Sequence, residues 1–116
     1  MLPYKRSERV AHLLREEIAE IITSKAKDPR LAFVTVTEVD VTPDLRLARV
    51  YVSTLKDEEK DDVLEVLGKV RPFIRQELGR RLRMKVIPDL EFRIDTSVGY
   101  GQHIEKILRD LKKEEQ

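Results

Sequence analysis

The chain has 116 residues, of which 41% are hydrophobic and 39% are charged, and its formal net charge is +1. This length suits one domain, and the hydrophobic share argues against disorder, which needs low hydrophobicity together with high net charge. The absence of cysteine excludes disulfides, thiolate metal sites and cysteine nucleophiles. No apolar run resembles a signal peptide or a membrane span, so we expect a soluble cytoplasmic protein.

The charges are unevenly distributed along the chain. Residues 1–15 carry four cations and one acid, and residues 69–85 carry seven cations and one acid, Glu77. Between them, residues 56–65 carry two lysines and six acids. Two basic segments separated by an acidic one predict a surface with a positive and a negative region.

The first predicted element is a helix over residues 7–26. Apolar residues recur there at helical spacing with charged residues between them, and Ser7 is the expected N-cap. β-branched residues then alternate with other residues at 33–41 and 45–53, which predicts two strands. The short turn at 42–44 predicts that these strands form an antiparallel hairpin.

The second half of the chain predicts a helix, a strand and a short final helix. An acidic loop at 56–62 leads into an apolar helical stripe that ends near Leu82, and residues 90–95 alternate as a third strand. A short helix follows residue 102, and residues 112–116 are expected to be a flexible charged tail. Strands joined through a helix run parallel, so the order predicts a two-layer α+β domain in which the helices cover one face of a mixed sheet.

A proline interrupts the second helical stripe. Pro72 cannot donate a hydrogen bond to the carbonyl oxygen of Gly68, and its ring clashes with that oxygen. We therefore expect the helix axis to bend or break between Gly68 and Pro72, around Val70. Two interpretations stay open, a kinked core helix and a pair of helices that meet at a turn used for contact.

Four stretches in a specific order and spacing carry a resemblance to a known family. They are Arg9-Val10 with Glu17-Ile18-Ala19 and Ile21-Ile22; Lys27-Asp28-Pro29-Arg30-Leu31; Asp44-Leu45 with Ala48-Arg49-Val50-Tyr51-Val52-Ser53; and Phe73-Ile74-Arg75, Leu78-Gly79, Leu82-Arg83, Pro88-Asp89-Leu90-Glu91-Phe92, Asp95 and Ser97. On these residues the chain resembles the ribosome-binding factor A family, small bacterial proteins that assist late maturation of the small ribosomal subunit. The resemblance runs from about Lys5 to Leu111.

The resemblance implies a KH-like domain of the second type over residues 1–111. It also implies a non-enzymatic assembly factor that binds the free 30S small subunit at 16S rRNA near its 5′-terminal region. Such a factor assists 16S rRNA processing as a monomer and uses no cofactor and no small-molecule substrate. KH domains usually carry a GxxG loop, and this family has an Ala-x-Gly kink instead. The matching residues here, Val70-Arg71-Pro72, fit neither pattern, so we expect the kink to shape a surface and arginines to supply the contact.

Arginine and lysine residues are the candidate RNA contacts, because cations bind the phosphate backbone and guanidinium groups match its geometry. The candidates are Lys5, Arg6, Arg9, Arg30, Arg46, Lys69, Arg71, Arg75, Arg80, Arg81, Arg83 and Lys85. Alternatives stay open for each group. Cations at the helix end and at the N-terminus could be ordinary solvated residues, and Arg30 could bind phosphate or pin its loop to Asp28.

The sequence contains no motif of a catalytic or metal site. It has two histidines and lacks HExxH, a Gly-rich phosphate loop and GxSxG. The acidic run at 57–62 lacks the glycine and final glutamate of a calcium loop, so we interpret it as a solvated helix start. Two other function classes remain. A general single-stranded RNA-binding module would bind short RNAs without the subunit, and a protein–protein adaptor using the acidic loop and last helix would bind at high salt.

Overall fold

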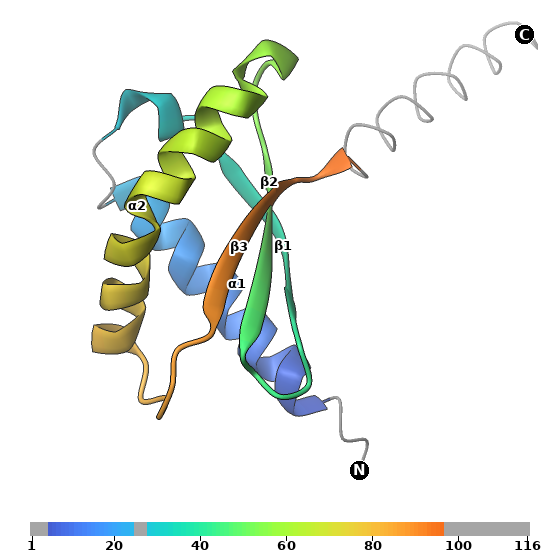
Figure 1. Cartoon of the computed structure of the whole chain (residues 1–116), viewed down its shortest axis with the longest axis vertical. Coiled ribbons are helices and arrows are strands. Elements are labelled where there is room, and N and C mark those ends of the chain that lie inside the picture. Colours follow the sequence, from blue (N-terminus) through green and yellow to red (C-terminus); the bar gives the residue numbers. More distant parts are fainter. Residues whose placement is uncertain (1–4, 25–27, 97–116) are drawn as a thin grey trace, which may run out of the picture.

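The computed structural model of the chain describes residues 5–24 and 28–96 (Figure 1). Two long α-helices, two short 3₁₀ helices and three strands make up this part of the chain. In chain order they are α1 (Lys5–Ser24), η1 (Pro29–Leu31), β1 (Thr35–Val41), β2 (Leu47–Ser53), η2 (Asp57–Glu59), α2 (Lys60–Arg81) and β3 (Asp89–Ile94). The expected final helix at 103–111 and the tail at 112–116 lie outside the described residues.

The three strands form one mixed sheet in the order β1-β2-β3. β1 pairs antiparallel with β2, and β2 pairs parallel with β3 through the α2 crossover, so both predicted pairings are confirmed. Val50 at the centre of the sheet lies opposite Val39 on one side and Phe92 on the other. The register shifts between Val36 and Glu38, which marks a β-bulge in β1.

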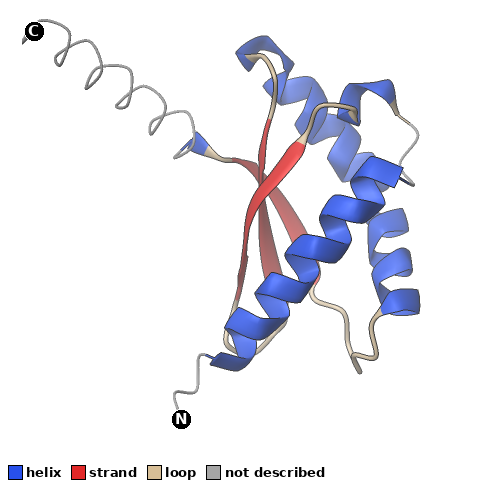
Figure 2. Ribbon diagram, turned by 180° about the vertical axis from the view of Figure 1, so that it is seen from behind, coloured by secondary structure: helices blue, strands red, loops and turns tan. Residues whose placement is uncertain are grey.

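Both long helices pack on the same face of the sheet (Figures 1 and 2). β2 shows why, because Ala48, Val50 and Val52 are completely buried while the residues between them are half-buried. Full burial of such an aliphatic side chain contributes about 1.5–3 kcal/mol. The helices supply the other half of the core, chiefly through Leu14, Ile18, Ile21, Val63, Val66, Leu67, Ile74 and Leu78. The predicted two-layer α+β class is confirmed, with the element order that the family resemblance implies.

Helix α1 begins at Lys5, two residues before the N-cap that the sequence predicts. The assignment of Ser7 as N-cap is wrong, because Ser7 lies inside the helix and is only 9% exposed. Ser7 precedes Leu14 by seven residues, so both lie on the helix face toward the core. At the other end, the hydroxyls of Thr23 and Ser24 donate to carbonyl oxygens one turn earlier, at 2.8 and 2.7 Å.

Helix α2 is one continuous helix that contains Pro72. Its two halves run in different directions, so the axis bends but does not break (Figure 1). The kinked-helix interpretation is therefore the one observed. Five buried residues explain the continuity, because they lie on both sides of the bend and pack into the same core, and they are Val63, Val66, Leu67, Ile74 and Leu78. Gly68 and Pro72 are exposed, and Val70 packs partly buried against the core.

The two hairpin strands begin two residues later than the sequence predicts, at Thr35 and Leu47. Before β1, the amide of Val34 donates to the carbonyl oxygen of Leu31 at 3.2 Å, which makes a turn. Before β2, Leu45 adopts a φ of 62° that no strand residue has. The third strand begins at Asp89, one residue before the predicted start.

Candidate nucleic-acid interface

Four of the predicted RNA contacts line a single surface hollow, here called the basic hollow. It has a volume of about 380 Å³ and is formed by the start of α1, the β1–β2 turn and the loop after α2. Its residues are Arg6, Val10, Asp44, Leu45, Arg46, Arg83, Met84, Lys85 and Val86. The chain folds these segments together because α1 crosses the sheet and the crossover returns β3 beside β2.

The four cations of the basic hollow are Arg6, Arg46, Arg83 and Lys85, and all four are exposed. Across the described ranges 5–24 and 28–96, none of them forms an ion pair with a carboxylate. Like charges held this close repel one another unless an anion lies between them. The basic hollow is therefore suited to bind an anion.

Asp44 is the acid among the residues that line the basic hollow, and its carboxylate shapes the turn. Its Oδ1 accepts a hydrogen bond from the hydroxyl of Thr42 at 2.6 Å and from the backbone amide of Arg46 at 3.1 Å. The hydrogen bond from Thr42, followed by that from the Arg46 amide, lowers the pKa of the Asp44 carboxyl below its ordinary value. The carboxylate thus holds the turn that presents the Arg46 side chain.

Four of the residues that line the basic hollow are apolar. Val10, Leu45 and Met84 are half-buried against the core, and Val86 is 66% exposed. Leu45 has a left-handed φ of 62°, a conformation that costs an L-residue about 1–2 kcal/mol. None of these four residues is among the contacts predicted from the sequence. Their position in the chain was the signal that could have found them, because each of the four adjoins a predicted cation.

Arg81 is another predicted contact, and its guanidinium is surrounded by carboxylates of the protein itself. Its Nη1 lies 3.1 Å from Oε2 of Glu17 and also contacts Glu20, and its Nε lies 3.7 Å from Oε2 of Glu77. The side chain is 23% exposed. Arg81 therefore ties the end of α2 to α1.

Arg71 and Arg75 share a face of α2 as predicted; Arg75 reaches the segment that enters β3, and Arg71 reaches the start of β3 itself. Arg75 donates to the carbonyl oxygens of Ile87 at 3.0 Å and Pro88 at 3.3 Å, and it lies 3.5 Å from Oδ1 of Asp89. Arg71 donates to the carbonyl oxygen of Leu90 at 3.5 Å. The two arginines line a shallow hollow of about 530 Å³ beside Pro72, together with Asp89 and Glu91. Asp89 pairs with Arg75, whereas Glu91 pairs with Arg49 and Arg93.

Three further candidates form ion pairs with carboxylates. Lys69 pairs with Glu65 at 3.3 Å, and Arg80 pairs with Glu77 at 3.1 Å, each within one turn of α2. Arg30 pairs with Asp28 at 2.9 Å and also donates from Nε at 3.1 Å, so the predicted pinning of the loop is observed. The side-chain hydrogen bond between them lowers the pKa of Asp28 and raises that of Arg30. A phosphate contact by Arg30 stays a prediction.

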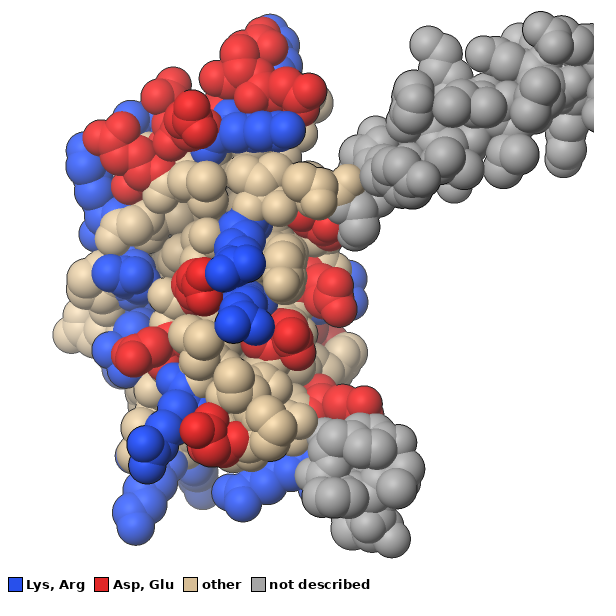
Figure 3. Space-filling view, turned by 45° about the vertical axis from the view of Figure 1, so that its right-hand side comes forward, with Lys and Arg blue, Asp and Glu red and all other residues tan. Residues whose placement is uncertain are grey.

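Arg9 is exposed on α1, and Lys5 is the first residue of that helix. The predicted polarised surface is visible in Figure 3, where acidic atoms gather over η2 and the start of α2 and basic atoms gather over the opposite end. Within the described part of the chain, four cations of the predicted set gather in the basic hollow without a carboxylate partner, whereas Lys69, Arg75, Arg80, Arg81 and Arg30 are paired with carboxylates of the protein itself. No described helix is long and apolar enough to span a membrane.

Comparisons with known sequences identify the family of the chain. A family model described as ribosome-binding factor A matches residues 6–108. The protein named Ribosome-binding factor A from Thermodesulfovibrio yellowstonii is 48% identical over 113 residues, which cover 97% of this chain and 96% of the relative. The protein of the same name from Staphylococcus carnosus is 46% identical over 111 residues, which cover 95% of this chain and 96% of the relative.

Solved structures with a similar fold carry the same name. The crystal structure of ribosome-binding factor A from Thermus thermophilus has a TM-score of 0.69 and 31% identity, covering 76% of this chain and 94% of that one. The solution structure of a putative ribosome binding factor A from Thermotoga maritima has a TM-score of 0.69 and 32% identity, covering 80% and 90%. A homology model of the Thermus thermophilus factor, fitted into a cryo-EM map of a 30S complex, has a TM-score of 0.62 and 31% identity, covering 72% and 88%. The chain belongs to the ribosome-binding factor A family.

Proposed function

We propose that this chain is a non-enzymatic assembly factor that binds the free small ribosomal subunit through the basic hollow. The observation that carries the proposal is the convergence of Arg6, Arg46, Arg83 and Lys85 from three chain segments without carboxylate partners in the described part of the chain. One structural neighbour, the Thermus thermophilus factor fitted into a map of its 30S complex, supports the choice of the small subunit.

The basic hollow suits the backbone of folded RNA. Three of its four cations are arginines, whose planar guanidinium groups bind phosphate through two parallel hydrogen bonds. The apolar lining residues can lie against ribose, which fits recognition of RNA shape more than reading of base edges. The target we propose is 16S rRNA near its 5′-terminal region.

The mechanism we propose is stabilisation of one rRNA conformation. A ligand shifts an equilibrium only by the difference in its affinity for the two states, so the factor must bind the maturing subunit better than the finished ribosome. Such differential binding supports late maturation and 16S rRNA processing without a catalytic step.

Co-sedimentation tests the proposal. Wild type and the Arg6→Gln/Arg46→Gln/Arg83→Gln/Lys85→Gln variant are each mixed with purified small subunits, whole ribosomes and short single-stranded RNAs. We expect the wild type to sediment with free small subunits alone and the variant to remain in the supernatant. Tight binding of wild type to short RNAs without the subunit would instead support the general RNA-binding module. Binding that the variant retains would contradict the role of the basic hollow.

A further inference from the structure

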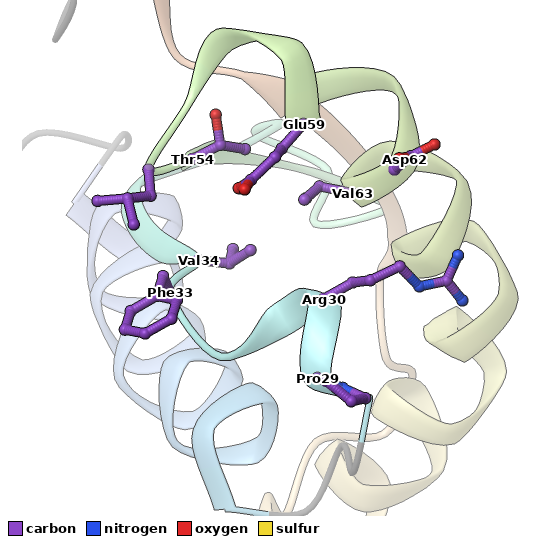
Figure 4. Close-up of a pocket in the computed structure, with 9 residues that line it drawn as sticks. Pro29, Arg30, Phe33, Val34, Thr54, Glu59, Asp62 and Val63 are labelled. Atoms are coloured by element: carbon purple, nitrogen blue, oxygen red, sulfur yellow. The ribbon is translucent and has the colours of Figure 1, made fainter.

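A third hollow lies at the opposite end of the molecule, and the function proposed above does not use it. It is here called the acidic-end hollow, has a volume of about 380 Å³ and lies between η1, the β2–η2 loop and the start of α2 (Figure 4). Its residues are Pro29, Arg30, Phe33, Val34, Thr54, Leu55, Glu59, Asp62 and Val63.

The acidic-end hollow exposes large apolar side chains. Phe33 is 70% exposed and Leu55 is 64% exposed, which are high values for residues of this size. Val34 and Val63 point into the hollow, and Phe33 lies at its rim (Figure 4). Exposed apolar residues grouped around a concave surface and bordered by polar residues are typical of an interaction site.

Carboxylates border this apolar surface. Glu59 and Asp62 line the acidic-end hollow, and Glu59 reaches over it in Figure 4. The neighbouring residues Asp57, Glu58 and Asp61 are exposed, and Asp57 pairs with Lys60 at 3.3 Å. Arg30 extends toward α2, and its charge is already compensated by Asp28 at 2.9 Å. The rim therefore has an excess of negative charge, which repels RNA phosphates and attracts cations.

We propose that the acidic-end hollow docks a short basic peptide segment that carries one large apolar side chain. The apolar side chain would lie against Phe33, Val34 and Leu55, and the flanking lysine or arginine residues would lie beside Glu59 and Asp62. Basic arms of this composition are common in proteins that bind nucleic acids. The proposal goes beyond RNA binding, because it assigns a protein partner to the end of the molecule opposite the basic hollow.

A labelled peptide provides the direct test. The probe is a dye-labelled peptide of about ten residues with one central leucine flanked by lysines, a length typical of groove-bound motifs. Fluorescence anisotropy with the full chain measures the dissociation constant. We expect binding that weakens about tenfold or more when the leucine is replaced by serine, since an apolar anchor dominates such contacts. Replacing the lysines by glutamates should abolish binding.

Variants locate the binding surface. Phe33→Ser/Leu55→Ser and Glu59→Lys/Asp62→Lys should each weaken peptide binding about tenfold or more. Leu13→Ser, on α1 and outside both hollows, is the matched control for loss of an exposed apolar residue, and Glu8→Lys is the control for reversal of charge. Both controls should bind the peptide as wild type does, and circular dichroism should show that every variant is folded.

Three results would overturn the proposal. The first is equal peptide binding by the acidic-end variants and the controls. The second is loss of rRNA binding in the acidic-end variants without any effect on the peptide, which would assign the hollow to RNA. The third is a concentration-dependent dimer in analytical ultracentrifugation that Phe33→Ser/Leu55→Ser abolishes, which would assign it to a second copy of this chain. Peptide binding and co-sedimentation with subunits are measured separately. A failure of the peptide proposal therefore does not decide the proposed function, which co-sedimentation tests by itself.

Discussion

Neutralising the four cations of the basic hollow should change how salt affects RNA binding. The perturbation is the combined variant Arg6→Gln/Arg46→Gln/Arg83→Gln/Lys85→Gln. Each cation that neutralises a phosphate contributes a slope of about −0.7 to −0.9 to the plot of log K against log salt concentration. Four such cations therefore predict that the variant slope is shallower by about 3. A fourfold rise in salt should then weaken wild type roughly 60-fold more than the variant.

A second variant with the same change in formal charge provides the control. Lys60, Lys69, Arg80 and Arg93 are each paired with a carboxylate, namely Asp57, Glu65, Glu77 and Glu91. Replacing these four cations by glutamine should change the slope by less than about 1, because the paired charges release few counterions on binding. Two of them, Lys69 and Arg80, belong to the RNA contacts predicted from the sequence. The comparison therefore shows whether RNA binding depends on the number of cations or on cations that have no carboxylate partner.

Filter binding to a 5′ fragment of 16S rRNA over a range of salt concentrations measures both slopes. Thermal unfolding of each variant, followed by circular dichroism, verifies that the fold is intact. Equal changes of slope in the two variants would refute the reasoning, because binding would then depend on net charge alone. An unchanged slope in the basic-hollow variant would place the RNA contact elsewhere on the surface.

Three further predictions concern stability. Arg81→Gln should lower the free energy of unfolding by about 1–2 kcal/mol, measured in urea, because it removes the guanidinium that three carboxylates share and leaves those acids close together. Gly68→Ala should raise the free energy of unfolding by about 0.5–1 kcal/mol, because an added Cβ meets nothing within 4 Å and alanine favours the helix. A lower free energy of unfolding would show that the bend needs glycine. Asp44→Asn should be less stable than wild type at neutral pH, because the folded state favours the ionised carboxyl of Asp44. The difference in stability should vanish as the pH falls through the lowered pKa of Asp44, below 3.8. A difference that persists in acid would exclude the charge of Asp44 as its cause.

The sequence predicted the order and pairing of the elements because both follow from local patterns. Alternating β-branched residues around the turn at 42–44 specify a hairpin, and the apolar stripe from Val63 to Leu78 specifies a crossover helix. The ends of the elements were less predictable, since tertiary contacts decide them. Ser7 has the chemistry of an N-cap, yet the helix extends past it and turns it toward the core. Leu45 looks like a strand residue, yet the hydrogen bonds of Asp44 hold a left-handed turn there.

The sequence could predict which cations are candidates for RNA contacts, but it could not predict which of them lie together on one surface. A run of arginines reports charge, but whether each arginine is available depends on partners that are distant in sequence. Arg81 meets Glu17, which lies 64 residues earlier, and Arg75 meets the carbonyl oxygen of Ile87 after the chain has turned. Arg6 joins Arg83 only because α1 and the loop after α2 arrive at the same end of the sheet. No pattern within one segment contains that information.

The bend at Pro72 connects these two groups of cations. Beyond the bend, Arg75 holds the segment that enters β3 and Arg81 holds α1, so the last turns of α2 are fixed between the sheet and the first helix. The loop that follows then carries Arg83 and Lys85 to the start of α1 and the hairpin turn. The contacts of Arg75 and Arg81 therefore fix the segments on both sides of the loop that carries Arg83 and Lys85. Substituting Arg75 or Arg81 would weaken RNA binding by moving this loop, with a loss of stability that substitution of Arg83 or Lys85 would not produce.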